Sequence, residues 1–254
     1  MLRLDNLSKN FGGLPALSQV SFTVPAARLT ALIGPNGAGK STLINCITGV
    51  LSPSSGSISF KGQEIAGLAA HQISRLGINR TFQNLRLFPR LDVLDNVLTG
   101  LTNRGGRSML MAMLRLPYLR HRERNMKLKA LESLDRFGLG EKAAWPAEVL
   151  AYGDKKRVEL ARAVVGDPAL LLLDEPVAGL NSQETAAVGE QLKQLRRSGH
   201  TILLVEHDME LVMEIADQVV VLDSGRCIAI GTPEEVRRNP LVLEAYLGTM
   251  EATA

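Results

Sequence analysis

Short apolar segments recur along the chain and are separated by longer polar stretches, several of which have helical periodicity. Short apolar runs between turn signals are typical of buried strands, and their alternation with helices is typical of a largely parallel sheet covered on both faces. We therefore predict an α/β fold with strands near residues 2–4, 20–24, 28–33, 58–60, 170–173, 202–205 and 219–222.

Residues 85–150 interrupt this alternation and have a helical pattern, including the mixed charges and leucines of residues 119–137. Because a long run of helices without strands does not fit the sheet's rhythm, we interpret it as an inserted helical lobe. The predicted domains are a core of residues 1–84 and 155–254 and a helical subdomain of residues 85–154.

The end of the chain carries a clear helix-start signal at residues 232–235, Thr-Pro-Glu-Glu. A capping threonine, a proline in the first turn and a glutamate that can cap in return together predict a helix N-terminus. We expect this helix to end near Asn239 and a second one to cover residues 241–247.

The length of 254 residues suits one large α/β domain or two small lobes. No apolar run approaches the roughly 18 residues that a membrane span needs, and the third residue is charged, so we expect a chain that is neither exported nor inserted. Cys46 and Cys227 lack metal-ligand spacing, and we interpret them as buried thiols in a reducing cytoplasm.

The net charge of +3 is mild, but basic residues gather between Arg104 and Lys129. Only Glu123 opposes them there, and three interpretations stay open: a solvated helix face, a docking surface or a site for anionic lipid headgroups. Nucleic acid is not an expected partner, because aromatic residues that would stack on bases are scarce. The span also contains Arg107, Arg115, Arg120, Arg122, Arg124 and Lys127.

The most specific motif is the glycine-rich stretch at residues 34–42, which fits G-x-x-x-x-G-K-S between a predicted strand and a helix-like segment. Glycines allow backbone N–H groups to close around phosphate oxygens. Lys40 is expected to reach the outer phosphates and Ser41 to hold Mg²⁺. A turn that binds nothing would not need every motif position, and dinucleotide loops space their glycines differently. We predict a nucleoside-triphosphate site formed by Gly34, Pro35, Asn36, Gly37, Ala38, Gly39, Lys40, Ser41 and Thr42.

Two carboxylates, Asp174 and Glu175, follow the apolar residues 170–173. A buried central strand would deliver them to the carboxyl edge of the sheet beside the glycine loop. Asp174 is expected to hold Mg²⁺ through water, and Glu175 to act as the general base that deprotonates the attacking water. The competing interpretation is a strand-ending turn with exposed acids.

His207 follows the apolar residues 202–205 in the same way. A histidine at a strand end can hydrogen-bond a γ-phosphate and keep the attacking water in line. Taken alone, a single histidine is more often structural.

The order of these motifs resembles the ATPase cassette of ABC transporters over nearly the whole chain. The resemblance is carried by GPNGAGKST, by Gln83 after a strand, by a glycine-bearing helix start before LLLLDEP, and by His207. Longer segments, such as NRTFQNLRLF and GTPEEVRRNPLVLEAYLG, resemble the subunits of branched-chain amino-acid importers in particular. The implied fold is a P-loop NTPase (RecA-like) core of ABC ATPase type with an antiparallel β portion and an inserted helical subdomain.

The resemblance also implies roles that spacing alone does not reveal. Phe11 matches the aromatic that stacks on adenine, and Gln83 matches the residue that links Mg²⁺ and the γ-phosphate to the membrane partner. Without the resemblance, Phe11 would be interpreted as a core aromatic and Gln83 as an exposed polar residue. Residues 178–181 match the loop that crosses the interface between two cassettes.

The phosphate-contacting signature of the family is LSGGQ, and this chain has Leu-Ala-Tyr-Gly-Asp at residues 150–154. Ala151 lacks the serine hydroxyl, and losing one hydrogen bond to a charged phosphate costs about 1.5–3 kcal/mol. The N–H groups at the start of the following helix remain as anion donors, so we expect weakened function. The residues expected to contact nucleotide are Ala151, Tyr152, Gly153 and Asp154.

The implied cofactors are ATP and Mg²⁺, and the implied protein is an ATP-hydrolysing subunit at the cytoplasmic face of the inner or plasma membrane. Its expected partners are a second cassette, transmembrane permease subunits near Gln83 and residues 85–89, and indirectly a solute-binding protein. The altered signature favours a heterodimer, with a homodimer as the alternative.

Two rival functions remain at this stage. One is the ATPase of another transporter, for example of lipid or lipopolysaccharide export, but those cassettes keep the signature serine. The other is an ABC ATPase that acts on nucleic acid, but such proteins have long coiled coils or two cassettes in one chain.

Overall fold

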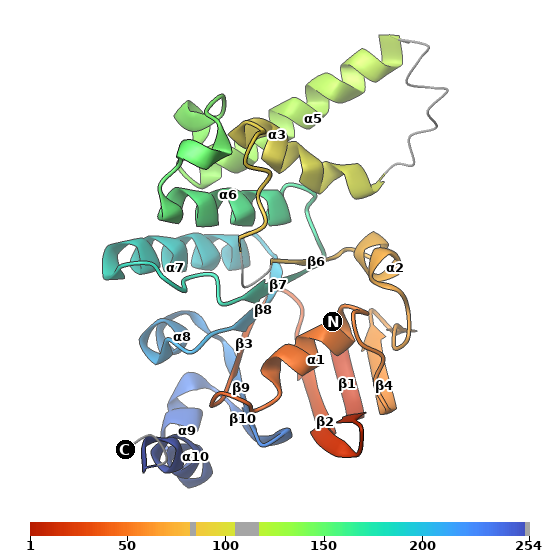
Figure 1. Cartoon of the computed structure of the whole chain (residues 1–254), viewed down its shortest axis with the longest axis vertical. Helices are drawn as coiled ribbons and strands as arrows, with labels where there is room; N and C mark the ends of the chain where they lie inside the picture. The colour runs from red at the N-terminus through yellow and green to blue at the C-terminus, as the bar shows by residue number, and fades with distance from the viewer. Residues whose placement is uncertain (82–84, 105–116, 252–254) are drawn as a thin grey trace. The chain divides into compact units, whose positions relative to one another are not determined.

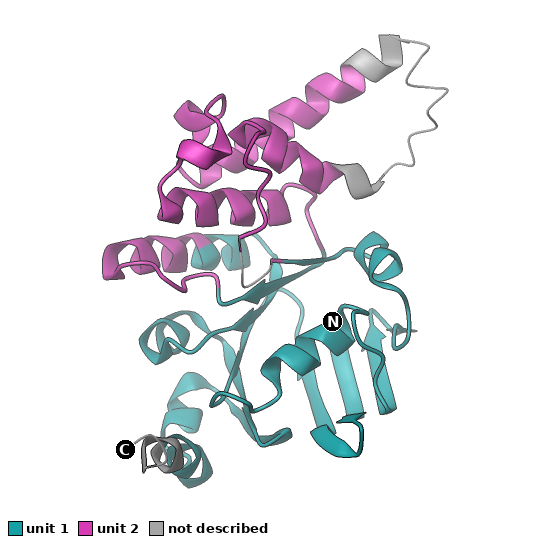
Figure 2. Cartoon of the chain, viewed as in Figure 1, with its two compact units in different colours: residues 1–80, 169–175, 192–254 teal, residues 81–168, 176–191 magenta. Residues whose placement is uncertain are grey.

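The computed structural model describes the backbone of residues 1–81, 85–104 and 117–251. It contains two compact units (Figure 2). The core unit comprises Met1–Arg80, Ala169–Glu175 and Leu192–Ala254, and the helical unit comprises Thr81–Pro168 and Pro176–Gln191. Among the helices of the described residues, none combines the length and apolar character that crossing a bilayer requires.

A six-stranded sheet forms the centre of the core unit, in the spatial order β10-β9-β3-β8-β7-β6. The five strands from β9 to β6 pair in parallel, and β10 pairs antiparallel to β9 at one edge. Every residue of β3, β7 and β8 is buried, as the unbroken apolar runs predicted. The strands are β3 (Leu29–Ile33), β6 (Ile78–Arg80), β7 (Leu170–Asp174), β8 (Thr201–Val205), β9 (Gln218–Asp223) and β10 (Arg226–Gly231).

A second, four-stranded sheet in the same unit is antiparallel throughout, in the order β2-β1-β4-β5. It corresponds to the antiparallel portion that the family resemblance implied. Its strands are β1 (Leu2–Phe11), β2 (Leu14–Val24), β4 (Ser55–Phe60) and β5 (Gln63–Glu64).

Helix α1 (Lys40–Ile47) lies between the two sheets of the core unit (Figure 1). Its Leu43 and Ile44 join one apolar core with Leu4 of the antiparallel sheet and Leu32 of β3. Ala31 and Ile33 point to the other face of β3 and pack in a separate core with residues of the C-terminal helices. Both faces of the parallel sheet are therefore covered. The other helices of this unit are α2 (Ala70–Arg75), α8 (Met209–Ile215), α9 (Pro233–Arg237) and α10 (Pro240–Glu251).

The predicted helix start near the C-terminus is present at α9. The Thr232 hydroxyl accepts a hydrogen bond from the Glu235 N–H at 3.3 Å, and the Glu235 carboxylate accepts one from the Thr232 N–H at 2.7 Å. Hydrogen bonding of the Glu235 carboxylate to the Thr232 backbone, and secondly to the Thr232 side chain, holds the pKa of Glu235 below its ordinary value. The following helix, α10, is longer than predicted.

The helical unit is built from α3 (Val93–Leu98), α5 (Pro117–Arg136) and α6 (Tyr152–Val164), which pack against one another. Helix α5 matches the helix predicted over residues 119–137. Residues 121–125 and 127–129 of α5 are exposed, so the described part of the basic span faces outward. The unit also contains short 3₁₀ turns at Thr99–Arg104, Gly140–Lys142 and Ala147–Val149, and the first part of α7 (Ser182–Arg197).

The division between the units differs from the predicted domain boundaries. Residues 155–168 and 176–191, which we placed in the core, group with the helical unit. The cause of the first difference is α6, which continues past residue 154 and packs on α3 and α5. The cause of the second is a set of contacts between residues 178–184 and the start of α6, described below.

The Asn96 side chain binds the backbone of the segment that precedes α3, at Phe88. Its side chain is fully buried, its carbonyl oxygen accepts a bond from the Phe88 N–H at 2.8 Å, and its amide donates to the Phe88 carbonyl at 3.0 Å. One side chain thus satisfies both backbone groups of an otherwise irregular segment.

Asn96→Ala should therefore lower the free energy of unfolding by about 1–3 kcal/mol, because it leaves the Phe88 backbone without these partners. Denaturant unfolding measures the loss, and hydrogen exchange should accelerate at residues 88–97. Asn125→Ala, on the exposed face of α5, is the matched control and should leave both unchanged. Equal stability of the two variants would contradict this role of Asn96.

Candidate active site

The glycine loop joins β3 to α1, where the prediction placed it. Gly34 has φ 149°, and a Cβ there would lie 2.0 Å from the Leu222 carbonyl oxygen. Gly39 has φ 99°, and a Cβ there would lie 2.7 Å from the Ala16 carbonyl oxygen. Only glycine fits these two positions, so the motif's glycines have a direct steric cause.

Lys40, the first residue of α1, is buried against this loop. Its ammonium donates to the carbonyl oxygens of Gly34 at 2.6 Å and Pro35 at 2.9 Å. Burial lowers the pKa of Lys40, while the negative charges of Glu175 and Asp174 act in the opposite direction. The structure thus brings together the predicted cation and both predicted carboxylates.

The start of α1 is suited to an anion. Its N-cap, Gly39, offers no side-chain hydrogen bond, and its first turn contains no acidic residue. The backbone N–H groups at this end are therefore available to phosphate oxygens, and the helix dipole adds to the attraction. Ser41 is exposed and Thr42 is half-buried at the same end, as binding residues must be.

Asp174 ends β7 and is 6% exposed. Its register partner in β8 is Val205, and its carboxylate accepts a hydrogen bond from Arg80 at 2.8 Å. Within the described residues, no three His, Cys, Asp or Glu side chains form a metal site. A single carboxylate, that of Asp174, beside the glycine loop still suits Mg²⁺, because this ion is usually held by one or two carboxylates together with substrate phosphates and water.

Glu175 has a left-handed backbone with φ 50°, which is unusual for a residue other than glycine. Such a conformation costs about 1–3 kcal/mol and collects at functional sites. The Glu175 N–H donates to the Val205 carbonyl at 2.9 Å, which fixes the residue beside the end of β8. The predicted base is therefore held in a strained but well-determined position.

His207 lies at the same edge, two residues after β8. Its side chain is 64% exposed, and its Nδ1 lies 3.8 Å from the carboxylate of the fully buried Glu206. Asp208 caps α8 by accepting a bond from the Leu211 N–H at 3.0 Å, which sets the direction of the chain after His207. The imidazole is thus open to a bound substrate.

Two residues assigned from the family resemblance have different outcomes. Phe11 ends β1 and is 46% exposed, with the Lys9 ammonium 5.2 Å from its ring centre, so it is not a core aromatic. Its stacking on adenine stays a prediction. Gln83 lies outside the described residues.

The signature segment belongs to the helical unit, where Ala151 is the N-cap of α6 and makes no side-chain cap. Tyr152 is half exposed, and its hydroxyl donates to the Ala178 carbonyl at 3.3 Å. A Cβ on Gly153 would lie 2.4 Å from a carboxylate oxygen of Glu184. The signature therefore rests on the segment that matches the family's interface-crossing loop.

Asp154 has a structural environment that sequence reasoning did not foresee. It is buried, and its carboxylate pairs with both Lys142 and Arg157. These contacts fix the first turn of α6 within the helical unit. A contact between Asp154 and nucleotide stays a prediction.

Two residues near the loop were missed at the level of sequence. Arg80 contacts Asp174 from the end of β6, and its only sequence signal is its place in the segment that leads to Gln83. Burial raises the pKa of the Tyr246 hydroxyl, and a hydrogen bond to the Gly34 backbone acts in the opposite direction. Tyr246 packs with the core behind β3.

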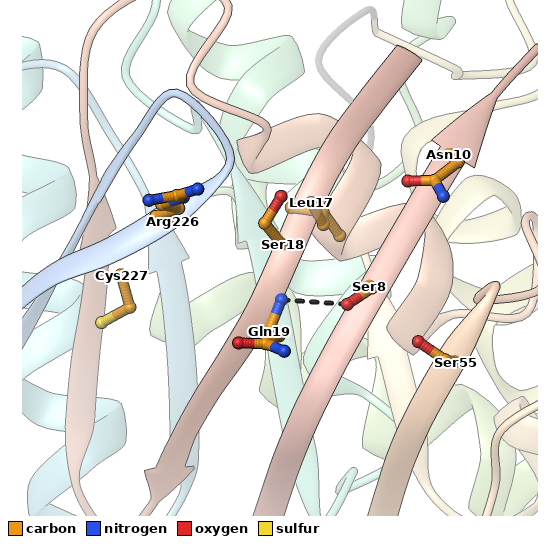
Figure 3. A pocket seen from close by; sticks show the side chains of 8 residues that line it. All are labelled: Ser8, Asn10, Leu17, Ser18, Gln19, Ser55, Arg226 and Cys227. Atoms are coloured by element: carbon orange, nitrogen blue, oxygen red, sulfur yellow. Dashed lines mark hydrogen bonds between the residues drawn. The ribbon is translucent and has the colours of Figure 1, made fainter. Parts of the chain in front are cut away.

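A separate polar hollow of about 650 Å³ opens beside β1, β2 and β10 (Figure 3). The Gln19 N–H donates to the Ser8 hydroxyl across it at 2.9 Å. It contains one guanidinium but no carboxylate, and none of its residues belongs to the predicted site. Its lining residues are Ser8, Asn10, Leu17, Ser18, Gln19, Ser55, Arg226 and Cys227.

Comparison with known proteins agrees with this geometry. Residues 17–178 match the family model described as ABC transporter, and residues 226–252 match one described as branched-chain amino acid ATP-binding cassette transporter. The high-affinity branched-chain amino acid transport ATP-binding protein LivG of Salmonella typhimurium is 43% identical over 249 residues, 98% of each chain.

Solved structures show the same fold. An ABC transporter cassette in its ADP conformation has a TM-score of 0.85 and 33% identity, with 98% of each chain covered. A dimeric cassette in a post-hydrolysis state, bound to ADP and phosphate, has a TM-score of 0.76 and 25% identity, with 92% of this chain and 99% of that one covered. The glycine loop, the strand-end carboxylates and these similarities lead to one conclusion: the chain belongs to the ATP-binding cassettes of ABC transporters, which bind and hydrolyse ATP.

Proposed function

We propose that this cassette powers an importer of branched-chain amino acids from the cytoplasmic face of the membrane, to which it binds peripherally. The observation that carries the proposal is the 43% identity to a branched-chain amino acid transport cassette over 98% of both chains. The C-terminal match at residues 226–252 supports the same solute class. The nucleotide site carries no information about the solute, so the relatives alone support that assignment.

The geometry of the core unit supports the roles proposed next, except that of Gln83, which only the family resemblance implies. Lys40 and the N-terminus of α1 neutralise and bind the phosphates, and Phe11 stacks on the adenine. When bound, Mg²⁺ neutralises charge on the phosphate oxygens, and Ser41, Gln83 and Asp174 are the residues that would hold it. Glu175 accepts the proton of the attacking water, and His207 holds that water in line by hydrogen bonding.

Glu175→Gln should retain ATP binding and lower turnover at least about a hundredfold, because the amide cannot accept the proton. Lys40→Ala should instead lose triphosphate affinity, because the buried cation is removed. Nucleotide titration and steady-state phosphate release separate the two effects. Near-normal turnover of Glu175→Gln would remove Glu175 as the base.

We propose further that the active assembly is a heterodimer in which a second cassette supplies a conventional signature to the ATP of this chain. The support is Ala151, which caps α6 without a hydroxyl. This chain would offer its own weakened signature, residues 151–154, to the partner's nucleotide.

The isolated chain should therefore hydrolyse ATP much more slowly than the assembled transporter. Phosphate release is measured for the purified chain alone and for the reconstituted transporter. Equal rates for the isolated chain and the assembly would contradict the asymmetric dimer.

The permease is proposed to dock on an apolar surface of the helical unit, defined here as Phe88, Leu91, Trp145 and Val149. All four are exposed, and their two segments are joined by backbone bonds from Val93 to Trp145 and from Ala147 to Leu91, both 3.0 Å. Exposed apolar side chains gathered in this way mark interaction sites. The surface includes part of the segment, residues 85–89, that the sequence indicated.

Uptake of leucine, isoleucine and valine should fall to background when the gene is deleted and return with the wild-type gene. Phe88→Ser should not restore uptake, although the purified variant hydrolyses ATP normally, because only permease contact is lost. Leu128→Ser, on the exposed face of α5, is the control and should restore uptake. Undiminished uptake after deletion would favour another cargo, such as an exported lipid, and co-purification with nucleic acid would favour the other rival.

A further inference from the structure

Arg80 joins three segments of the core unit that are far apart in the sequence. It ends β6, and its guanidinium donates to the Asp174 carboxylate at 2.8 Å from one nitrogen. Its other terminal nitrogen donates to the Asn45 side chain at 2.7 Å and to the Thr48 hydroxyl at 3.3 Å. Asn45 is part of α1 and Thr48 is its C-cap, and α1 begins at the glycine loop.

The contact is shielded from solvent. The side chains of Arg80 and Asp174 are 13% and 8% exposed, so water screens this ion pair only weakly. A planar guanidinium can bind two partners in fixed directions at once, whereas a lysine ammonium acts as a single point charge. Arg80 therefore fixes the direction of the Asp174 carboxylate relative to α1, in addition to balancing its charge.

We propose that Arg80 is a positioning residue for the magnesium-dependent part of nucleotide binding. By holding one carboxylate oxygen of Asp174, it keeps the side chain in a single orientation toward a metal-bound water. Arg80 itself contacts neither nucleotide nor metal in this role. The inference rests on the proposed function of Asp174 as a magnesium ligand through water.

Arg80 could also serve only to compensate a buried charge. That role would affect the folded core as a whole, so its loss would weaken nucleotide binding equally with and without Mg²⁺. A positioning role affects Asp174 selectively, because the glycine loop and Lys40 bind phosphate without it. The ratio of the two affinities therefore separates the roles.

The experiment measures ATP affinity of the full chain by fluorescence titration in excess EDTA and across a series of Mg²⁺ concentrations. For Arg80→Gln, ATP affinity in EDTA should stay within about twofold of wild type. The Mg²⁺ midpoint, defined as the Mg²⁺ concentration that gives half of the magnesium-dependent gain in ATP affinity, should rise at least about tenfold. An unchanged Mg²⁺ midpoint, or an equal loss of affinity in both conditions, would overturn the proposal.

Two variants keep the test decisive if Arg80→Gln fails to fold. Arg80→Lys retains the charge opposite Asp174 but not the fork to α1, so its Mg²⁺ midpoint should still rise several-fold while its thermal midpoint stays near wild type. Asn45→Ala removes only the anchor on α1 and should shift the Mg²⁺ midpoint in the same direction. A wild-type midpoint in both variants would overturn the proposal.

Asp174→Asn distinguishes a failure of this inference from a failure of the proposed site. If Asp174 has the proposed role, its amide variant loses the magnesium-dependent gain in affinity. Retention of that gain would refute the assignment of Asp174, and the inference about Arg80 with it. If Asp174→Asn loses the magnesium-dependent gain in ATP affinity but the Arg80 variants behave like wild type, only the inference about Arg80 is refuted.

Discussion

The parallel register of β3, β8 and β7 is the constraint on which the site depends. Because Asp174 pairs with Val205 and Leu32 also pairs with Val205, the three strands end at one edge and deliver the glycine loop, His207 and the two acids together. Successive residues of β3 point into two different apolar cores, so a slip of one residue would place Leu32 in the core that now holds Ala31 and Ile33.

Much of this arrangement could be predicted because its signals are local. The glycine loop, the acids after residues 170–173 and the capping box at Thr232 are each contained in a few consecutive residues, and the structure places them as expected. Apolar runs identified the buried strands for the same reason. The positions that the acids and His207 take relative to the loop required only the rule that parallel strands end at a common edge.

What escaped prediction depends on contacts between residues remote in sequence. Arg80 and Asp174 are separated by 94 positions, and neither local pattern indicates the pairing. The two compact units divide the chain differently from the predicted boundary at residue 154, because α6 continues past that residue and packs on α3 and α5. Asp154 was grouped with nucleotide-binding residues by its place in the motif, whereas its burial and its pairing with Lys142 depend on how α6 packs.

The backbone of Glu175 has an implication for how this site can change over time. The left-handed conformation at φ 50° is one that glycine adopts without strain, so glycine at this position would relieve the local backbone strain. It would also remove the carboxylate. Relief of this strain would therefore erase the proposed base, so backbone strain and the proposed turnover are linked at this residue. In a library screened only for thermostability, glycine at position 175 would be a substitution that removes the proposed base.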